Sequence, residues 1–84
     1  MAKGVRWTVE ARADLRAMDR DTALRLLKAL GRFLKTDAGN VKQLAGFDPP
    51  LFRLRVGAWR LIYRIPSDDI IEIIRVRNRR EAYR

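Results

Sequence analysis

Residues 51–65 read LFRLRVGAWRLIYRI, and apolar and basic residues alternate there on both sides of a Gly-Ala pair. Because successive side chains of a strand point to opposite faces, this pattern predicts two strands that share one apolar and one basic face. Gly57 suits the first central position of a type II′ turn, whose twist matches that of the strands it joins. The segment therefore predicts a β-hairpin that covers a hydrophobic core on one face and presents arginines to water on the other.

A two-residue turn at residues 57–58 fixes the register of this hairpin. Val56 then lies opposite Trp59, and Arg55 lies opposite Arg60. The core face collects Phe52, Leu54, Val56, Trp59, Leu61 and Tyr63, and the opposite face collects Arg53, Arg55, Arg60 and Arg64 around Ile62.

A further strand is predicted at residues 70–77, after a four-residue loop at residues 66–69. With this loop Leu61 pairs with Ile74 and Trp59 with Val76, so that Ile74 and Val76 fall on the core face. Glu72 falls on the same face near Tyr63, and Ile73 falls on the arginine side beside Ile62. The pairing also predicts a row of Arg55, Arg60 and Arg75 across three strands, with Arg77 beside it. A one-residue change in the loop would turn every side chain of this strand over.

The first half of the chain has mainly helical periodicity. Residues 5–9 predict a short strand, and the pattern becomes helical from Glu10. A second helix begins after Asp19 or Asp21 and ends at Gly39 and Asn40. Its expected apolar stripe consists of Ala23, Leu27, Leu30 and Leu34, widened by Leu24, Leu26 and Phe33. Residues 41–45 add a strand, and the order β-α-α-β-β-β-β predicts one α+β domain over residues 1–84, with two helices packed on one face of a mostly antiparallel sheet.

The charge balance points to a polyanionic partner. Among the 84 residues, 19 are lysine or arginine and 10 are acidic, so the net charge is +9, and 15 of the 19 basic residues are arginine. The arginine guanidinium binds phosphate bidentately and stacks on bases, which makes nucleic acid the first candidate partner. The alternative is a solvated basic surface, in which long arginines splay into water and their stems cover Ile62 and Ile73.

Composition also excludes several classes of site. The chain has no cysteine and no histidine, which removes thiolate metal sites, disulfides and the usual general base. We therefore expect no metal and no cofactor. The start of the chain does not read as a signal peptide, and no apolar segment approaches the length of a membrane span, so we expect a soluble cytoplasmic protein with no membrane partner.

The arginine face predicts a function because it has an energetic cost. Like charges directly opposite each other destabilise a sheet by about 0.2–1 kcal/mol per pair, and an anion bound on that face would relieve the repulsion. The closing segment, residues 75–84 (RVRNRREAYR), adds five arginines and a tyrosine. Tyr83 is interpreted either as a group that stacks on a base or transfers a proton, or as an anchor of the chain end to the core.

Three segments in this order resemble the RelE/ParE superfamily of bacterial and archaeal toxins, and the RelE side in particular. They are residues 40–46 (NVKQLAG), residues 52–65 (FRLRVGAWRLIYRI) and residues 76–84 (VRNRREAYR). The resemblance implies a compact α+β fold, an acidic antitoxin as partner, and metal-independent, ribosome-dependent cleavage of mRNA in the A site.

The resemblance also implies roles for single residues. Arg60 would bind the scissile phosphate, Arg53 would orient it, Arg79 would neutralise developing charge, and Tyr83 would transfer a proton or stack on a base. The wider RNA-binding surface would comprise Lys42, Arg55, Arg75 and Arg77. Two positions depart from the family pattern: Asn78 stands where many relatives have histidine, and Leu51 stands where active members can have lysine.

Two other functions remain open from the sequence. ParE-type members of the superfamily act on DNA gyrase rather than on RNA, and a small RNA- or DNA-binding module needs no catalysis at all. In both toxin interpretations the antitoxin would neutralise the basic face and dock on the second helix or on a sheet edge. The sequence does not choose between these docking modes, and it leaves the oligomeric state open.

Overall fold

The computed structural model describes residues 4–78, and the hairpin expected from the sequence lies in the interior of its sheet. Strands β3 (Leu51–Val56) and β4 (Trp59–Ser67) pair with Val56 opposite Trp59 and Arg55 opposite Arg60, which confirms the expected register. Gly57 has a φ of +60°, the positive value that the first central position of a type II′ turn requires.

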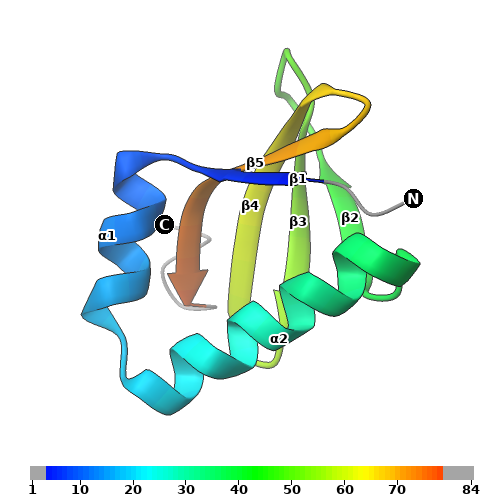
Figure 1. Ribbon diagram of the computed structural model, residues 1–84. Helices are drawn as coiled ribbons and strands as arrows, with labels where there is room; N and C mark the ends of the chain where they lie inside the picture. Colours follow the sequence, from blue (N-terminus) through cyan, green and yellow to red (C-terminus); the bar gives the residue numbers. More distant parts are fainter. Residues whose placement is uncertain (1–3, 79–84) are drawn as a thin grey trace.

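Five strands form one sheet in the order β1-β5-β4-β3-β2 (Figure 1). β2 (Asn40–Leu44) lies at one edge and pairs antiparallel with β3, while β1 (Gly4–Trp7) lies at the other edge and pairs parallel with β5 (Ile70–Asn78). The first and last described strands are therefore neighbours. The element order and the mostly antiparallel sheet confirm the predicted α+β fold.

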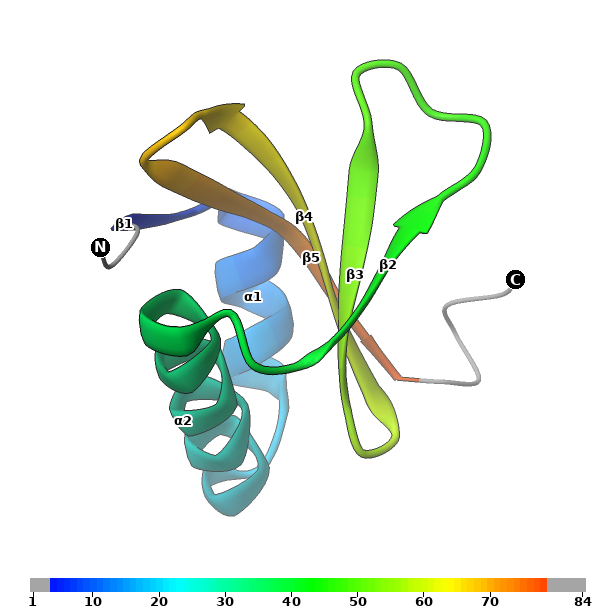
Figure 2. The same cartoon turned by 90° about the vertical axis from the view of Figure 1, so that its right-hand side faces the viewer.

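Helices α1 (Val9–Ala17) and α2 (Arg20–Thr36) lie on the same side of the sheet, as Figure 2 shows. Side-chain oxygens of Thr8 and Asp19 accept hydrogen bonds from the first-turn amides and so cap the two helices. α2 ends at Thr36, before the expected Gly39 and Asn40, and its C-cap Asp37 adopts a left-handed conformation with a φ of 58°. None of the helices in residues 4–78 is long and apolar enough to cross a membrane.

The hydrophobic core lies between α2 and the inner face of the sheet. Three buried side chains of α2, Leu26, Leu30 and Phe33, contact this layer, whereas Leu24 and Leu27 are 43% and 41% exposed. The expected stripe was therefore wrong for these two leucines, because α2 rests on the sheet along a narrow face and both side chains lie beyond it. The buried sheet residues are Leu54, Leu61, Tyr63, Ile71, Ile73 and Val76.

The predicted pairing of β4 with β5 is wrong. β4 extends to Ser67, which pairs with Ile70 across a two-residue turn, so the expected four-residue loop does not form. Leu61 pairs with Val76, two residues further along than expected, and the pairing is interrupted twice.

The interruption at Ile74 decides which side chains of β5 reach the core. Tyr63 pairs with Ile73 and Ile62 with Arg75, so Ile74 is an extra residue in β5. An extra residue reverses the alternation of a strand, and Ile73 and Val76, three residues apart, are therefore both buried. Glu72 consequently lies on the face opposite the core, where its carboxylate contacts Arg6 and Arg64.

Thr8 holds this irregular part of β5 against α1. Its hydroxyl donates to the Ile74 carbonyl at 2.9 Å and accepts from the Ala11 N–H at 3.1 Å, and its own N–H donates to the Ile73 carbonyl. A single residue thus caps α1 and satisfies a carbonyl that the interrupted pairing leaves open.

Candidate nucleic-acid interface

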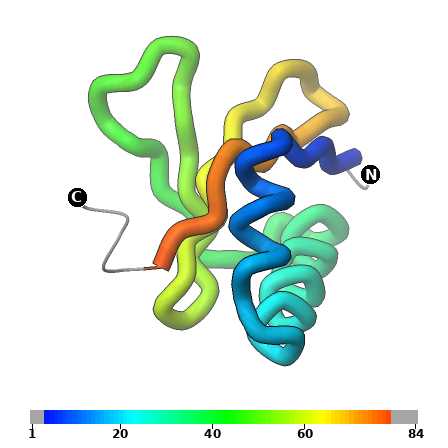
Figure 3. Tube along the Cα trace, turned by 90° about the vertical axis from the view of Figure 1, so that its left-hand side faces the viewer, coloured from blue at the N-terminus to red at the C-terminus, as the bar shows by residue number. Residues whose placement is uncertain are grey.

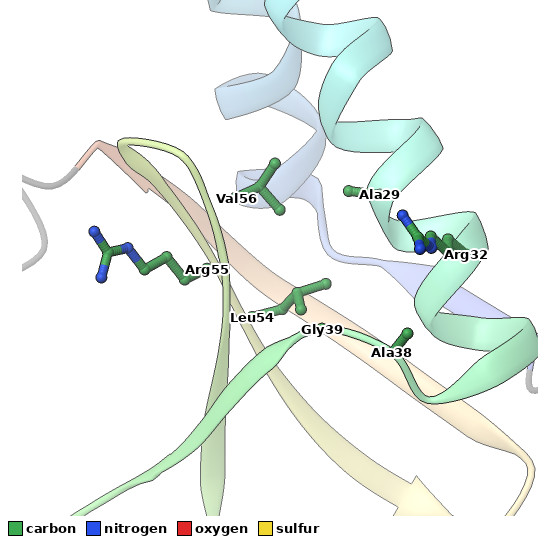
Figure 4. Close-up of a pocket in the computed structure, with 7 residues that line it drawn as sticks. All are labelled: Ala29, Arg32, Ala38, Gly39, Leu54, Arg55 and Val56. Carbon is green, nitrogen blue, oxygen red and sulfur yellow. The ribbon is translucent and has the colours of Figure 1, made fainter.

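Basic side chains gather on the face of the sheet opposite the helices, which we call the outer face. Alternation along β3 points Leu54 and Val56 toward α2 and Arg55 away from it, as the close-up in Figure 4 shows. The cross-strand register then forms two rows on the outer face. One row contains Asn40, Arg55, Arg60 and Arg77, and the other contains Lys42, Arg53, Ile62 and Arg75.

These rows bring the first cluster of predicted site residues together. Directly opposed residues on adjacent strands are about 5 Å apart, and alternate residues along one strand are about 7 Å apart. The Cβ atoms of Arg53, Arg55 and Arg60 therefore lie within about 10 Å of one another. Arg53 donates to the Asn40 side-chain oxygen and Arg55 donates to the Gly57 carbonyl, both long bonds to neutral acceptors. Among the described residues 4–78, neither guanidinium group forms an ion pair with a carboxylate.

Arg60 differs from its neighbours because it is buried. It is 5% exposed, and it is the one charged residue buried within residues 4–78. The expectation that all the hairpin arginines face water was therefore wrong for Arg60. It lies between Arg55 and Arg77 in the register, which places a fixed cation in the middle of a basic row.

Arg75 lies in a different position from the one expected. It pairs with Ile62 rather than Arg60, and Arg77 takes its predicted place in the row. Its guanidinium contacts Asp14 of α1 through Nε at 2.9 Å and Nη2 at 3.0 Å, and the Val76 N–H also donates to Asp14. Figure 3 shows α1 lying alongside β5, which makes this contact geometrically direct. Arg75 therefore joins a helix to the sheet.

The carboxylate of Asp14 titrates below the usual range for aspartate. Burial acts to raise its pKa, but the hydrogen bonds from Arg75 and from the Val76 N–H outweigh this effect, so the pKa is lowered. A carboxyl whose pKa is lower in the folded state than in the unfolded chain contributes stability above about pH 4, and this contribution is lost as the pH falls through the folded-state value.

We expect Asp14→Asn to lower the free energy of unfolding at pH 7 by about 1–2 kcal/mol, because the charge-assisted bonds to Arg75 and Val76 are lost. Arg75 is 35% exposed, so solvent screening keeps the loss at the lower end of the range for such bonds. Urea titrations at pH 7 and at pH 3 measure the effect, and the difference from wild type should shrink at pH 3. Asp68→Asn, in the exposed β4–β5 turn, is the control, and an equal loss in both variants would contradict the role given to Asp14.

Comparison with known proteins identifies the family to which this fold and this basic face belong. A model of the ParE toxin of the type II toxin–antitoxin system, parDE, matches residues 5–83. The chain belongs to this ParE toxin family. It is thus a toxin of the RelE/ParE superfamily, as the sequence motifs indicated.

Solved structures of toxin–antitoxin complexes share the fold of this ParE-family toxin. A chain of the RelBE2 complex from Mycobacterium tuberculosis is 28% identical, with a TM-score of 0.78 over 94% of this chain and 100% of that one. A chain of the archaeal RelE–RelB complex from Pyrococcus horikoshii is 22% identical, with a TM-score of 0.75 over 96% and 99% of the two chains. A chain of the ParDE system from Pseudomonas aeruginosa is 17% identical, with a TM-score of 0.54 over 92% and 96%. A comparison with curated protein sequences gave no match.

Sequence reasoning missed the acidic contacts of the outer face in this toxin. Glu72 accepts from the Nε atoms of Arg6, at 2.8 Å, and of Arg64. The bond from Arg64 is the main cause of a lowered Glu72 pKa, and the bond from Arg6 adds to it against the effect of partial burial. Arg64 therefore belongs to an ion-paired end of the outer face, away from the row that contains Arg60. Glu72 lies opposite Arg6 on β1 and opposite Arg64 on β4. These contacts could have been predicted from the sequence only with the correct register of β5.

Two predicted site residues of the toxin, Arg79 and Tyr83, lie outside the described residues. The tyrosine of the hairpin, Tyr63, is a core residue that stacks against Phe52 with ring centroids 5.5 Å apart. Burial raises its pKa to about 12, so it remains a protonated structural group. Residues 4–78 contain no cluster of three or more acidic, histidine or cysteine side chains that would hold a metal ion.

Proposed function

We propose that this toxin is a ribosome-dependent endoribonuclease that holds the RNA backbone on the outer face of its sheet. The observation that carries the proposal is the gathering of Arg53, Arg55 and Arg60 from two strands on one face, with neutral acceptors for Arg53 and Arg55. The likeness to a chain of the Mycobacterium tuberculosis RelBE2 complex supports the RelE-type activity.

RNA cleavage of this kind requires the protein mainly to position the RNA and to supply positive charge. RNA supplies its own nucleophile, the 2′-hydroxyl, which attacks the adjacent phosphorus and expels the 5′-oxygen of the next nucleotide to leave a 2′,3′-cyclic phosphate. The protein aligns this attack and neutralises the charge that develops on the phosphate oxygens. Arginine stays protonated and is a poor general base, so Arg53 and Arg60 serve as cations. Tyr83 is assigned the proton transfer or a stacking contact, and Arg79 is assigned a share of the neutralisation.

The different exposure of the arginines suggests an order of contact. Arg55 is exposed and Arg53 is half-buried, so these two make the first phosphate contacts together with Lys42 and Arg77. Arg60 is positioned behind them and engages the scissile phosphate once the side chains around it shift. Arg75 anchors α1 through Asp14 and takes a smaller part in RNA binding than the sequence implied.

A test of this function incubates the purified toxin with ribosomes that carry a defined message and maps the cuts. We expect A-site cuts with wild type and a cleavage rate about tenfold to a hundredfold lower with Arg53→Ala, because the remaining cations orient the phosphate less well. Arg25→Ala, an exposed arginine of α2 on the other side of the sheet, is the control and should cut at the wild-type rate.

The match to the ParE toxin family favours a second candidate function, inhibition of DNA gyrase. Supercoiling by gyrase in the presence of the same purified toxin tests it directly. Gyrase-dependent DNA breaks together with an uncut message would overturn the nuclease proposal in favour of this one.

The proposed partner in either case is an acidic antitoxin, because the solved structures that share the fold are toxin–antitoxin complexes. With a net charge of +9, the toxin would attract such a partner over distance, and capture would be fast and would slow as salt is added. Ribosome, message and antitoxin together imply action in the cytoplasm.

A further inference from the structure

A hollow of about 350 Å³ opens on the outer face next to the arginine rows. Its lining includes Phe47, Pro49, Leu51, Arg64, Glu72 and Ile74, and we call it the Phe47 hollow. Leu51 points to the same face as Arg53 and lies two residues from it along β3, so the hollow begins about 7 Å from the first phosphate-binding side chain. One nucleotide of an extended RNA strand would bridge this distance.

The apolar part of the hollow has an aromatic rim. Phe47 lies in the loop between β2 and β3, is 52% exposed and is absent from the hydrophobic core, while Leu51 and Ile74 are half-buried below it. An exposed phenylalanine beside a basic surface is the kind of platform on which proteins stack single-stranded bases, because every base has an aromatic face.

The polar part of the hollow is lined by Thr8, Asp48, Arg64 and Glu72. Among these, Glu72 is an acceptor whose position is fixed by its ion pairs. The carboxylate of Glu72 is held by the Nε atoms of Arg6 and Arg64, one on each of its two oxygens. An ionised carboxylate has about four acceptor positions, so further positions remain for N–H groups of a ligand. Its low pKa keeps it ionised at neutral pH. An amino group of adenine, cytosine or guanine supplies such donors, whereas uracil has no exocyclic amino group.

We propose that the Phe47 hollow receives one unstacked base of the RNA strand and prefers a base with an exocyclic amino group to uracil. Phe47 stacks on the base, Glu72 accepts from its amino group, and the phosphates on either side run toward Arg53. This inference rests on the proposed RNA-binding function of the same face, and it makes Phe47 and Glu72 specificity-determining residues of that face.

The test measures binding of the purified full-length toxin to fluorescent tetranucleotides of cytidine, adenosine and uridine at one fixed salt concentration, because phosphate contacts make every such affinity salt-dependent. We expect wild type to bind the cytidine and adenosine oligomers at least about fivefold more tightly than the uridine oligomer. Phe47→Ala should weaken binding about tenfold, and Phe47→Trp should preserve it. Leu24→Ala, a similarly exposed apolar side chain on α2 on the opposite side of the sheet, should bind as wild type does.

Glu72→Gln tests the base preference separately from the stacking. The amide keeps the size of the side chain but replaces one acceptor by a donor, so the preference for cytidine over uridine should fall to about onefold to twofold. Thermal denaturation of each variant shows whether it is folded. Phe47 is exposed in a loop, so its variants are expected to fold. They still test the proposal if Glu72→Gln unfolds.

Several results would overturn the inference. The first three are no oligomer binding by wild type, no base preference in wild type, and equal affinity of wild type and Phe47→Ala for the oligomers. The fourth is a Phe47→Ala variant that captures the antitoxin less well but binds RNA as wild type does. The last result would make the hollow a protein-docking site. Message cleavage that is insensitive to Phe47→Ala, in rate and in base pattern, would reject the hollow and keep the nuclease. Phe47-dependent oligomer binding without any message cleavage would keep the hollow as a base-binding site and reject the nuclease function.

Discussion

Arg60→Ala is expected to cut ribosome-bound message about 10²–10³-fold more slowly than wild type. Loss of one fixed, preorganised group that stabilises developing negative charge costs an enzyme about this factor. Arg60 is suited to the role because its burial, at 5% exposure, orders its own side chain, so that only the side chains covering it have to move, whereas a solvated arginine would first have to be ordered. Arg60→Lys keeps the charge but not the planar fork, so its rate should lie between those of wild type and Arg60→Ala. Single-turnover cleavage of a defined message on purified ribosomes measures all three rates.

The controls for Arg60 must separate catalysis from folding, since a buried side chain is removed. Arg12→Ala, an exposed arginine of α1, should retain the wild-type rate. Antitoxin capture and thermal denaturation should show that Arg60→Ala remains folded. A folded Arg60→Ala variant that cuts at the wild-type rate would remove Arg60 from the proposed site.

Leu26→Ala is expected to lower the free energy of unfolding by about 3 kcal/mol, because it removes a fully buried side chain and leaves a cavity. Leu26 is 1% exposed and faces the sheet, whereas the next residue of the same helix, Leu27, is 41% exposed. Leu27→Ala should therefore cost less than about 1 kcal/mol. A domain of this size is stabilised by only about 5–10 kcal/mol, so the first loss is a large part of the total.

Urea denaturation of the two alanine variants measures this difference, and their neighbouring positions in one helix make them matched controls for each other. The slope of the unfolding curve should be the same in both variants if neither changes the denatured state. An equal loss of unfolding free energy in the two variants, or a larger loss for Leu27→Ala, would mean that α2 packs on the sheet through the side of its apolar stripe that contains Leu27.

The sequence predicted the β3–β4 hairpin well because every determinant of its register is local. A two-residue turn with Gly57 at the required position leaves one pairing that puts all the apolar residues on one face. The same reasoning failed for β5. The extra residue at Ile74 reverses the alternation in mid-strand, and its stabilisation by Thr8 comes from 66 residues away along the chain. An alternating pattern read as regular cannot reveal such a residue.

The candidate site was partly predictable for a similar reason. Arg53, Arg55 and Arg60 could be placed on one face because they belong to the hairpin, whereas the pairing of Lys42 with Arg53 became known only from the structure. The contact of Arg75 with Asp14 could not be predicted, because it depends on α1 lying alongside β5. The burial of Arg60 and the Phe47 hollow likewise depend on how separate segments cover the outer face, which the residue pattern of one strand does not encode.

The parallel pairing of β1 with β5 has a consequence for how the toxin is made. The amide of Gly4 bonds to the carbonyl of Asp69, so β1 can join the sheet only after β5 has been synthesised. Contacts between such distant parts of a sequence slow folding, since the entropy of closing the intervening chain is lost before the contact forms. The toxin would thus leave β1 unpaired during its own synthesis until β5 has been made.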